Sequence, residues 1–482
     1  MNNLKQMEGT TFYFVDCAQT NRAAKKLARS HVMKGKNAGK KFQRRSRLQL
    51  APPRVNAGER KIILRRDLDK SQEEFHYSNE EYAKLMAIME YPRNAILTGL
   101  SVNITNHSME IMNEYFTRIM NRLYRLNPWL SMDEVRRMWL PLIFANQAAY
   151  YCNIALMQTC NEIYSDNGNS SPKALFHLSE TFNYVTRLLA GPDALSDAAI
   201  MIVVTLVSQE LIRKGYGNLR VHLDGLQKMI QLRGGLPKLE GSIALMMKLC
   251  KVDIMLAIQH GGQPLFFRDR MAKVRDVLAR KKIDFDGNAA ASCPQHDLLE
   301  PYLYDILVDT MGATSLFNKG VRLDLETLQE MILSIGYRLT QFRPSEEDRK
   351  LWQLQDSYHI GLTIWTMTVF LHGGRRQILD YERLDHRLKE ILDSDLEDHN
   401  PELALWLLIL GGVWVSDGYE YDEHWLPPRI RPMAMRLNIR SWDEVCTIVG
   451  HFPWIHALHD DLGRALWDRA HRDELMPSLI TM

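Results

Sequence analysis

From about residue 78 onward, the sequence repeats apolar residues at helical spacing between residues that typically begin or end helices. Ser78 and Ser131 are each followed three residues later by Glu, which is the spacing of a capping box at a helix start. Pro172 stands where a helix would begin, and Gly191 where it would end. Long stretches of alternating apolar and polar residues are absent. The pattern predicts an all-α fold, with one large multi-helix domain over residues 71–482.

Several segments are predicted individually. A helix near Ser108 is expected to stop at Asn127-Pro128 and to carry on one stripe Ile111, Tyr115, Ile119 and Leu123. A second helix is expected from Leu219 to Leu232 and to end at Gly234-Gly235. Ser345 and Asp348 form a capping-box-like pair, and loops are expected at 165–171 and 284–294. The loop region near 284–296 is also where the helical domain could be subdivided.

The longest apolar runs predict buried helices rather than membrane spans. They are Ala198–Val207, Ile360–Leu371 and Leu403–Val415. A membrane-spanning helix needs about 20 apolar residues, and no secretory leader is recognised at Met1–Gly9, so we expect an intracellular protein with no membrane partner. Large residues at helical spacing are expected in the core, although a ligand pocket between helices would use the same residue types. These residues are Trp352, Trp365, Trp406, Trp414, Met246 and Met247.

Positive charge is concentrated near the N-terminus. Residues 21–66 contain sixteen Lys and Arg residues and one acid, Glu59, whereas the whole chain has a formal net charge of only +2. The rest of the chain is therefore net acidic. A basic arm joined to an acidic body is expected when one end of a protein meets a polyanion, although such blocks also occur as solubilising tails.

The predicted arm covers residues 1–70. Thr20–Met33 would form an amphipathic basic helix, while Gly35, Gly39 and Pro52-Pro53 make the following segment a loop or linker. The run Lys40–Arg47 is typical of a nuclear-import patch or a phosphate-binding strip. The candidate residues for nucleic-acid contact or nuclear import are Arg22, Lys25, Lys26, Arg29, Lys34, Lys36, Lys40, Lys41, Arg44, Arg45 and Arg47. DNA and an import receptor are the expected partners, and RNA stays possible because counterion release does not distinguish polyanions.

Other motifs do not predict a reaction centre. The segment Gly35–Lys41 has three residues between its glycines and lacks the Ser or Thr of a phosphate-binding loop. The six cysteines form no Cys-x-x-Cys pair, so a disulfide framework is not expected. The C-terminal His and Asp residues could suggest a metal site, but a solvated helix face is the preferred interpretation. These residues are His451, His456, His459, Asp460, Asp461 and His471. We therefore predict no catalytic residue, no metal and no cofactor.

Two stretches resemble the fungal-specific transcription factor domain proteins. They are Phe12–Val15 followed by Arg29–Asn37, and His222–Leu236, which contains the more specific motif. The similarity extends loosely from about Phe75 to about Phe267. In the second motif, a helix is expected to turn Leu223, Leu226, Ile230 and Leu232 toward a core and to end at Arg233-Gly234-Gly235. This motif is a packing signature and not a binding site.

The resemblance implies a nuclear regulatory protein, often one tied to fungal secondary-metabolite or nutrient pathways. Many members carry a binuclear zinc cluster with six closely spaced cysteines, which the scattered cysteines here do not provide. Any DNA contact must then use the basic arm or a partner. We expect a transcriptional regulator in the nucleus, with other transcription proteins as partners and possibly a homo-oligomer. The alternatives are a co-regulator that does not bind DNA and an all-helical enzyme with its site in the helical body.

Overall fold

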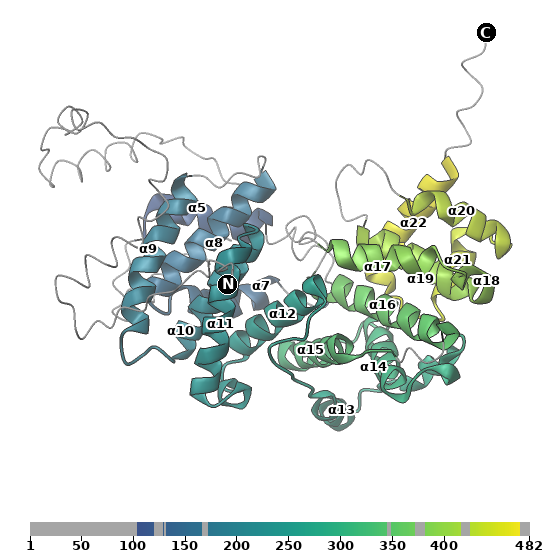
Figure 1. Ribbon diagram of the computed structural model, residues 1–482, viewed down its shortest axis with the longest axis horizontal. Helices are drawn as coiled ribbons and strands as arrows, with labels where there is room; N and C mark the ends of the chain where they lie inside the picture. The colour runs from purple at the N-terminus through teal and green to yellow at the C-terminus, as the bar shows by residue number, and fades with distance from the viewer. Residues whose placement is uncertain are drawn as a thin grey trace, which may run out of the picture. The chain divides into compact units, whose positions relative to one another are not determined.

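The computed structural model describes residues 104–119, 129, 132–165, 172–344, 349–371, 381–415 and 425–472. All of them belong to one compact unit of the chain, residues 77–482. This described part contains 17 α-helices and no strand, which confirms the predicted all-α class (Figure 1). The predicted arm and the cap residues Ser78, Ser131 and Ser345 lie outside the described residues, and the boundary at residue 70 stays a prediction.

The first helices run from residue 106 to residue 260. In chain order they are α5 (Asn106–Glu114), the π-helical turn η1 (Tyr115–Ile119), α7 (Met132–Ile143), α8 (Gln147–Ser165), α9 (Pro172–Leu189), α10 (Asp197–Ile212), α11 (Tyr216–Arg233), the 3-10 turn η2 (Leu236–Leu239) and α12 (Ile243–His260). Helix α10 contacts α8, α11 and α12. It is apolar on all sides, and every residue from Ala199 to Val207 is buried, so the first apolar run is a core helix as predicted.

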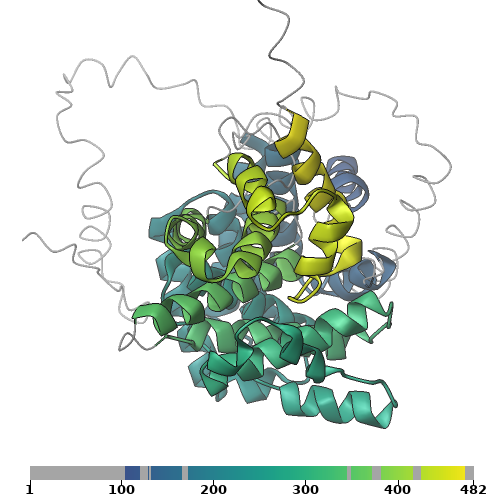
Figure 2. The same ribbon diagram turned by 90° about the vertical axis from the view of Figure 1, so that its right-hand side faces the viewer.

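The later helices run from residue 271 to residue 472. They are α13 (Met271–Arg280), η3 (Gly287–Ser292), η4 (His296–Leu298), α14 (Pro301–Asn318), α15 (Leu325–Gln341), α16 (Arg349–Leu371), α17 (Glu382–Leu392), α18 (Leu396–His399), α19 (Pro401–Val415), α20 (Pro427–Arg436), α21 (Trp442–Val449) and α22 (His456–Arg472). Helix α19 is buried from Leu403 to Val415 and contacts α16, α18, α20 and α22. Figure 2 shows the yellow α22 beside the light-green helices. No helix of the described residues is long and apolar enough to cross a membrane.

Most predicted helix ends agree with the structure. Helix α9 begins at Pro172 and ends just before Gly191, and α11 ends at Gly234, which has the left-handed φ of 101° that favours glycine. The helix near Ser108 begins slightly earlier than expected. Its cap is Thr105, whose side chain accepts from the Ser108 N–H at 3.1 Å while Ser108 Oγ accepts from the Thr105 N–H at 3.0 Å. Ser108 is therefore the N3 residue of a capping box whose N-cap is Thr105.

The expected inward face of α11 is wrong at one position. Leu226 and Ile230 are buried, but Leu232 is 61% exposed. A helix turns by about 100° per residue, so Leu232 stands roughly 200° away from Ile230 and cannot share its face. Leu219 and Met229 complete the buried stripe instead.

The large residues expected in the core are mostly there. Trp365, Trp406, Trp414, Met246 and Met247 are buried, whereas Trp352 is only half-buried. The expected loop at 284–294 contains the 3-10 turn η3, which packs against α14. The Tyr358 hydroxyl of α16 donates to the Pro294 carbonyl at 2.5 Å, which ties the end of this loop to α16. A subdivision of the body at 284–296 stays a prediction.

Gly361 allows α16 and α19 to approach closely. A Cβ atom at Gly361 would overlap the ring of Trp406, which is itself stacked on Phe452 with ring centroids 5.0 Å apart. We expect Gly361→Ala to lower the free energy of unfolding by about 1–3 kcal/mol, because the buried indole has no room to shift. Urea unfolding followed by circular dichroism measures the change.

The matched control is Gly225→Ala in α11, where a Cβ would meet no atom within 4 Å. This change should stabilise the protein by about 0.5–1 kcal/mol, since alanine is the better helix former. Equal effects of the two substitutions would contradict the close approach of α16 and α19.

Candidate functional site

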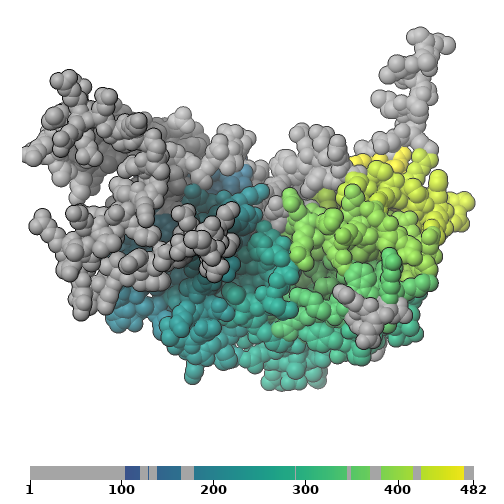
Figure 3. All heavy atoms as spheres, in the orientation of Figure 1, coloured from purple at the N-terminus to yellow at the C-terminus, as the bar shows by residue number. Residues whose placement is uncertain are grey.

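A cavity of about 550 Å³ lies between the C-terminal ends of α12 and α15 and the facing sides of α16 and α17. Cavities of this size commonly hold small molecules. In the space-filling view of Figure 3, a crevice is visible where the teal surface of the earlier helices meets the green surface of the later ones. This cavity, lined by described residues of four helices, is the candidate functional site.

Two structural features shape the α12 side of the cavity. Helix α12 ends at Gly261, whose φ of 66° is left-handed, so the chain can turn away from the helix axis there. The Arg383 side chain of α17 lies directly against Gly261, because a Cβ at this position would overlap the Arg383 guanidinium. Glycine is thus required at residue 261 both by its backbone conformation and by its neighbour.

The walls are largely apolar. The apolar lining residues include Ala257, Ile258, Leu339, Phe342, Ile360 and Leu384. Ala257 and Ile258 belong to the last turn of α12, and Leu339, Ile360 and Leu384 come from α15, α16 and α17. Such walls favour a ligand with a hydrocarbon body.

The polar part of the cavity comes mainly from Asp356 of α16 and Arg387 of α17. Arg387 Nη2 lies 2.8 Å from Asp356 Oδ2, Arg387 Nη1 lies 2.9 Å from Glu390 Oε2, and the guanidinium lies 4.9 Å from the centre of the Trp352 ring. The stacked cation explains why Trp352 is not in the core. Burial raises the pKa of the Asp356 carboxyl, and the positive charge of Arg387 opposes that shift.

His359 contributes a neutral ring to the same cavity. Its Nε2 lies 2.9 Å from the Leu339 carbonyl oxygen, so Nε2 must carry the proton and donate it. Burial lowers the pKa of His359 to about 4. The cavity lining therefore holds this uncharged ring and a second histidine, His386. It also holds three arginines, Arg343, Arg383 and Arg387, and two acids, Asp356 and Glu390. This arrangement favours binding of an organic anion over bond-breaking chemistry.

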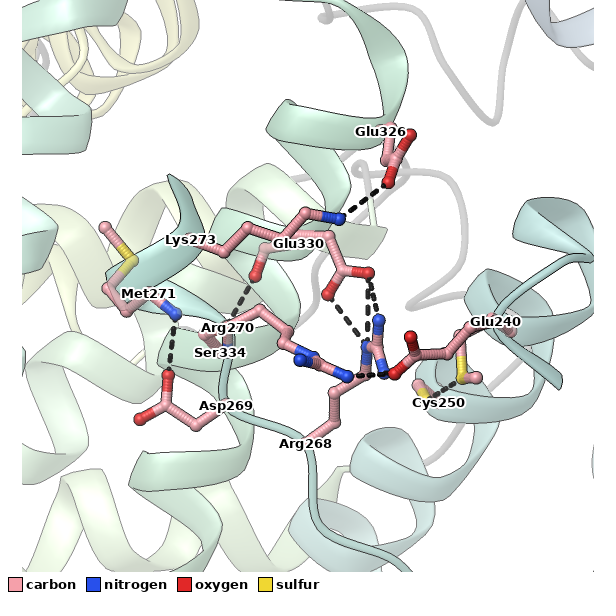
Figure 4. Close-up of polar contacts among 11 residues, drawn as sticks. Glu240, Cys250, Arg268, Asp269, Arg270, Met271, Lys273, Glu326, Glu330 and Ser334 are labelled. Carbon is pink, nitrogen blue, oxygen red and sulfur yellow. Dashed lines mark hydrogen bonds and ion pairs between the residues drawn. The ribbon is translucent and has the colours of Figure 1, made fainter. Parts of the chain in front are cut away.

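A second polar cluster fixes the segment that joins α12 to α13 (Figure 4). Arg268 lies across Glu330 of α15, with Nε 2.8 Å from Glu330 Oε2 and Nη2 2.5 Å from Oε1. Glu240 accepts from both Arg268 and Arg270, and the Arg270 N–H donates to Ser334 Oγ at 2.8 Å. These charges satisfy one another, so the cluster acts as a structural joint between α12 and α15.

Asp253 of α12 holds the other end of this segment. Its carboxylate accepts from the Leu265 N–H at 2.7 Å, the Phe266 N–H at 2.9 Å and the Tyr337 hydroxyl at 3.0 Å. Burial raises the pKa of Asp253 to about 6, although these three donors favour the charged form. The segment 265–270 is thus bonded to both helices that supply one wall of the cavity.

The site residues predicted from sequence are not among the described residues that line the cavity. Arg22, Lys25, Lys26, Arg29, Lys34, Lys36, Lys40, Lys41, Arg44, Arg45 and Arg47 are all outside the described residues, so their roles stay predictions. The sequence analysis did not single out Asp356, Arg383 or Arg387. An acid, two bases and a histidine scattered over helices α16 and α17 have no motif spacing, and only the packing of the helices brings them together.

The C-terminal His and Asp residues considered as a metal site do not come together in the structure. His456 pairs with Asp460, with Nδ1 3.1 Å from Oδ2, whereas His471 Nδ1 donates to the Trp467 carbonyl of its own helix at 2.8 Å. His459 is fully buried and faces Thr368 of α16. Among the residues with described positions, no group of three or more His, Cys, Asp or Glu could hold a metal ion.

Comparison with known proteins identifies one region of the chain. Residues 110–278, from α5 into α13, match the fungal specific transcription factor domain family. No zinc-cluster family was found. No curated protein matches the chain, and no solved structure does. The match includes the His222–Leu236 motif and the Asp253 and Arg268 contacts, and it ends before α14.

The buried His459 makes stability depend on pH. Its Nδ1 accepts from the Ile455 N–H at 3.1 Å, and burial, aided by the charge of His456, lowers the pKa of His459 to about 3. The unfolded chain binds a proton near pH 6.5, so it holds more protons than the folded chain between pH 3 and 6.5. The contribution of the neutral His459 ring to the free energy of unfolding is fully present above pH 6.5 and is lost as the pH falls toward 3. Between pH 7 and pH 5 this loss is about 2 kcal/mol.

Urea unfolding at pH 7 and pH 5 checks this expectation. His459→Gln should reduce the difference between the two pH values by about 2 kcal/mol, even though it lowers stability at pH 7. The control is His399→Gln, since the His399 side chain is 49% exposed and should leave the difference unchanged. Identical pH dependence of wild type and His459→Gln would rule out the buried neutral ring.

Proposed function

Because residues 110–278 carry a fungal specific transcription factor domain, we propose that this protein is a nuclear transcriptional regulator whose basic arm supplies both import and DNA-backbone contact. The family consists of transcription factors and not of enzymes, which leaves the helical-enzyme alternative without support. The family match is the observation that carries the regulatory part of the proposal.

The charge distribution supports the role of the arm. Sixteen bases and one acid lie within residues 21–66, in a chain with net charge +2. Lysine and arginine side chains bind phosphates at any sequence and release counterions from the nucleic acid. The arm, Arg22–Arg47 above all, would hold the protein on DNA, while sequence choice comes from base contacts within the arm or from a partner protein.

The helical body supports the regulatory role. It is net acidic, so it does not compete with the arm for nucleic acid, and it contains a cavity of about 550 Å³. Control by a bound small molecule or by another transcription protein is the function that this body best fits. Control of a secondary-metabolite or nutrient pathway is part of the proposal only through the family resemblance.

Genome occupancy tests the arm directly. We expect Lys40/Lys41/Arg44/Arg45→Ala, fused to a foreign nuclear import signal, to lose most promoter occupancy while it still enters the nucleus. The matched control removes four exposed bases of the body instead, Arg220, Lys228, Lys238 and Arg280. Retained occupancy by the arm variant would favour the second candidate function, a co-regulator that reaches DNA through a partner and uses its arm only for import.

Salt dependence gives an independent measurement on purified protein. If eight bases of the arm contact phosphates, log affinity for duplex DNA should fall with log salt at a slope of about −7, or roughly four decades between 50 and 200 mM. The four-alanine arm variant should have a slope about half as steep. Equal affinity for RNA would redirect the proposal to the RNA alternative.

A further inference from the structure

The cavity combines an apolar body with an excess of positive charge. Its lining has three arginines against two acids. Of its two histidines, His359 is neutral because burial lowers the pKa of its ring to about 4, and His386 Nε2 lies 3.4 Å from Glu390 Oε1. Arg387 is compensated by Asp356 and Glu390, at 2.8 and 2.9 Å. The other two arginines determine which ligand charge the cavity accepts.

Arg343 and Arg383 have no acidic partner among the described residues. Arg343 Nη1 donates to the Thr340 carbonyl at 2.9 Å and to the Phe342 carbonyl at 2.6 Å, which fixes its guanidinium at the cavity edge without neutralising it. Arg383 rests against the backbone of Gly261 and forms no ion pair with the described chain. A guanidinium presents a planar pair of N–H donors that matches a carboxylate or a similar anion.

Asp356 is already paired with Arg387 and is not a ligand group for an anion. Its side chain is only 5% exposed, and its Oδ2 atom lies 2.8 Å from Arg387 Nη2. Because this acid neutralises Arg387 and not Arg343 or Arg383, the charge of those two arginines stays available to a bound molecule.

We propose that the cavity between α12, α15, α16 and α17 binds a small amphipathic organic anion, with its anionic group held by Arg383 and Arg343 and its hydrocarbon body against Ile258, Leu339 and Ile360. The bound molecule bridges α12 of the family-matched region and α15–α17 beyond it. Binding therefore stabilises one arrangement of these helices, and this is how an effector would act on the body. The inference deepens the proposed regulatory function and rests on it for its biological meaning.

The test uses a pair of fluorescent probes of nearly equal size on the full chain without nucleic acid. The anionic probe is 1-anilinonaphthalene-8-sulfonate, and its neutral analogue, N-phenyl-1-naphthylamine, lacks the sulfonate. We expect one saturable site for the anionic probe and weaker binding of the neutral one. Arg383→Gln should weaken the anionic probe by roughly tenfold, as expected for one charge-assisted hydrogen-bonded contact, and leave the neutral probe unchanged.

A variant with a filled cavity provides the second part of the test. Gly262 lines the cavity, and a Cβ added there meets no atom within 4 Å, so Gly262→Trp introduces a large side chain without a backbone clash. We expect this variant to lose saturable binding of the anionic probe. Its matched control is Gly241→Trp, another turn glycine with open space around its Cβ, outside the cavity. Melting curves by circular dichroism identify any variant that fails to fold.

Two results would overturn the proposal. Unchanged probe affinity in Gly262→Trp would place binding elsewhere, and equal loss of both probes in Arg383→Gln would remove the selectivity for anions. Neither result involves DNA, so failure here leaves the proposed transcriptional role intact. A variant that loses promoter occupancy but still binds the anionic probe would likewise distinguish the ligand site from the transcriptional role.

Discussion

The anchoring of residues 265–270 between α12 and α15 is the constraint on which the central architecture depends. Asp253 binds two consecutive backbone N–H groups at the start of this segment, and Arg268 lies across Glu330 at its end. A buried ion pair contributes little net stability compared with apolar packing, but removing one partner leaves the other charge buried and unpaired. The cluster therefore fixes the position of α15 beside α12 more than it stabilises the fold. The cavity wall that these two helices form is a consequence of that fixed position.

The arginines of the joint between α12 and α15 are paired with acids, whereas those of the cavity are only partly paired. Around Arg268 and Arg270 every base has an acidic partner, as Figure 4 shows for Glu240 and Glu330. Farther along α15, Arg338 likewise binds the buried Asp309 of α14, with Nη2 2.5 Å from Oδ2. In the cavity, by contrast, Arg383 is left without an acid in the described chain. Compensated charges are what a rigid joint requires, whereas an uncompensated guanidinium beside an apolar wall suits an anionic ligand.

The cavity lies at the boundary between the family-matched residues and the later helices, and this position bears on regulation. The matched region ends at residue 278, inside α13. Residues Ala257–Gly262 lie within it, whereas the cavity residues of α15, α16 and α17 lie beyond it. A molecule bound there contacts both portions of the helical body. A basic arm that binds nucleic acid without sequence choice would need a second input of this kind for control.

The sequence by itself determined the all-α class, the buried apolar runs such as Leu403–Val415, and helix ends such as Gly234, because these follow from local propensity and helical period. It also determined the concentration of bases in residues 21–66, which needs no folding at all. It failed at Leu232, where helical rotation turns an apolar residue outward, and it gave no sign of Asp356, Arg383 or Arg387 as a group. Only the tertiary structure decided that arrangement, since α12, α15, α16 and α17 meet through contacts between residues far apart in the chain. Packing of distant helices, and not any local pattern, creates the cavity and selects the side chains that line it.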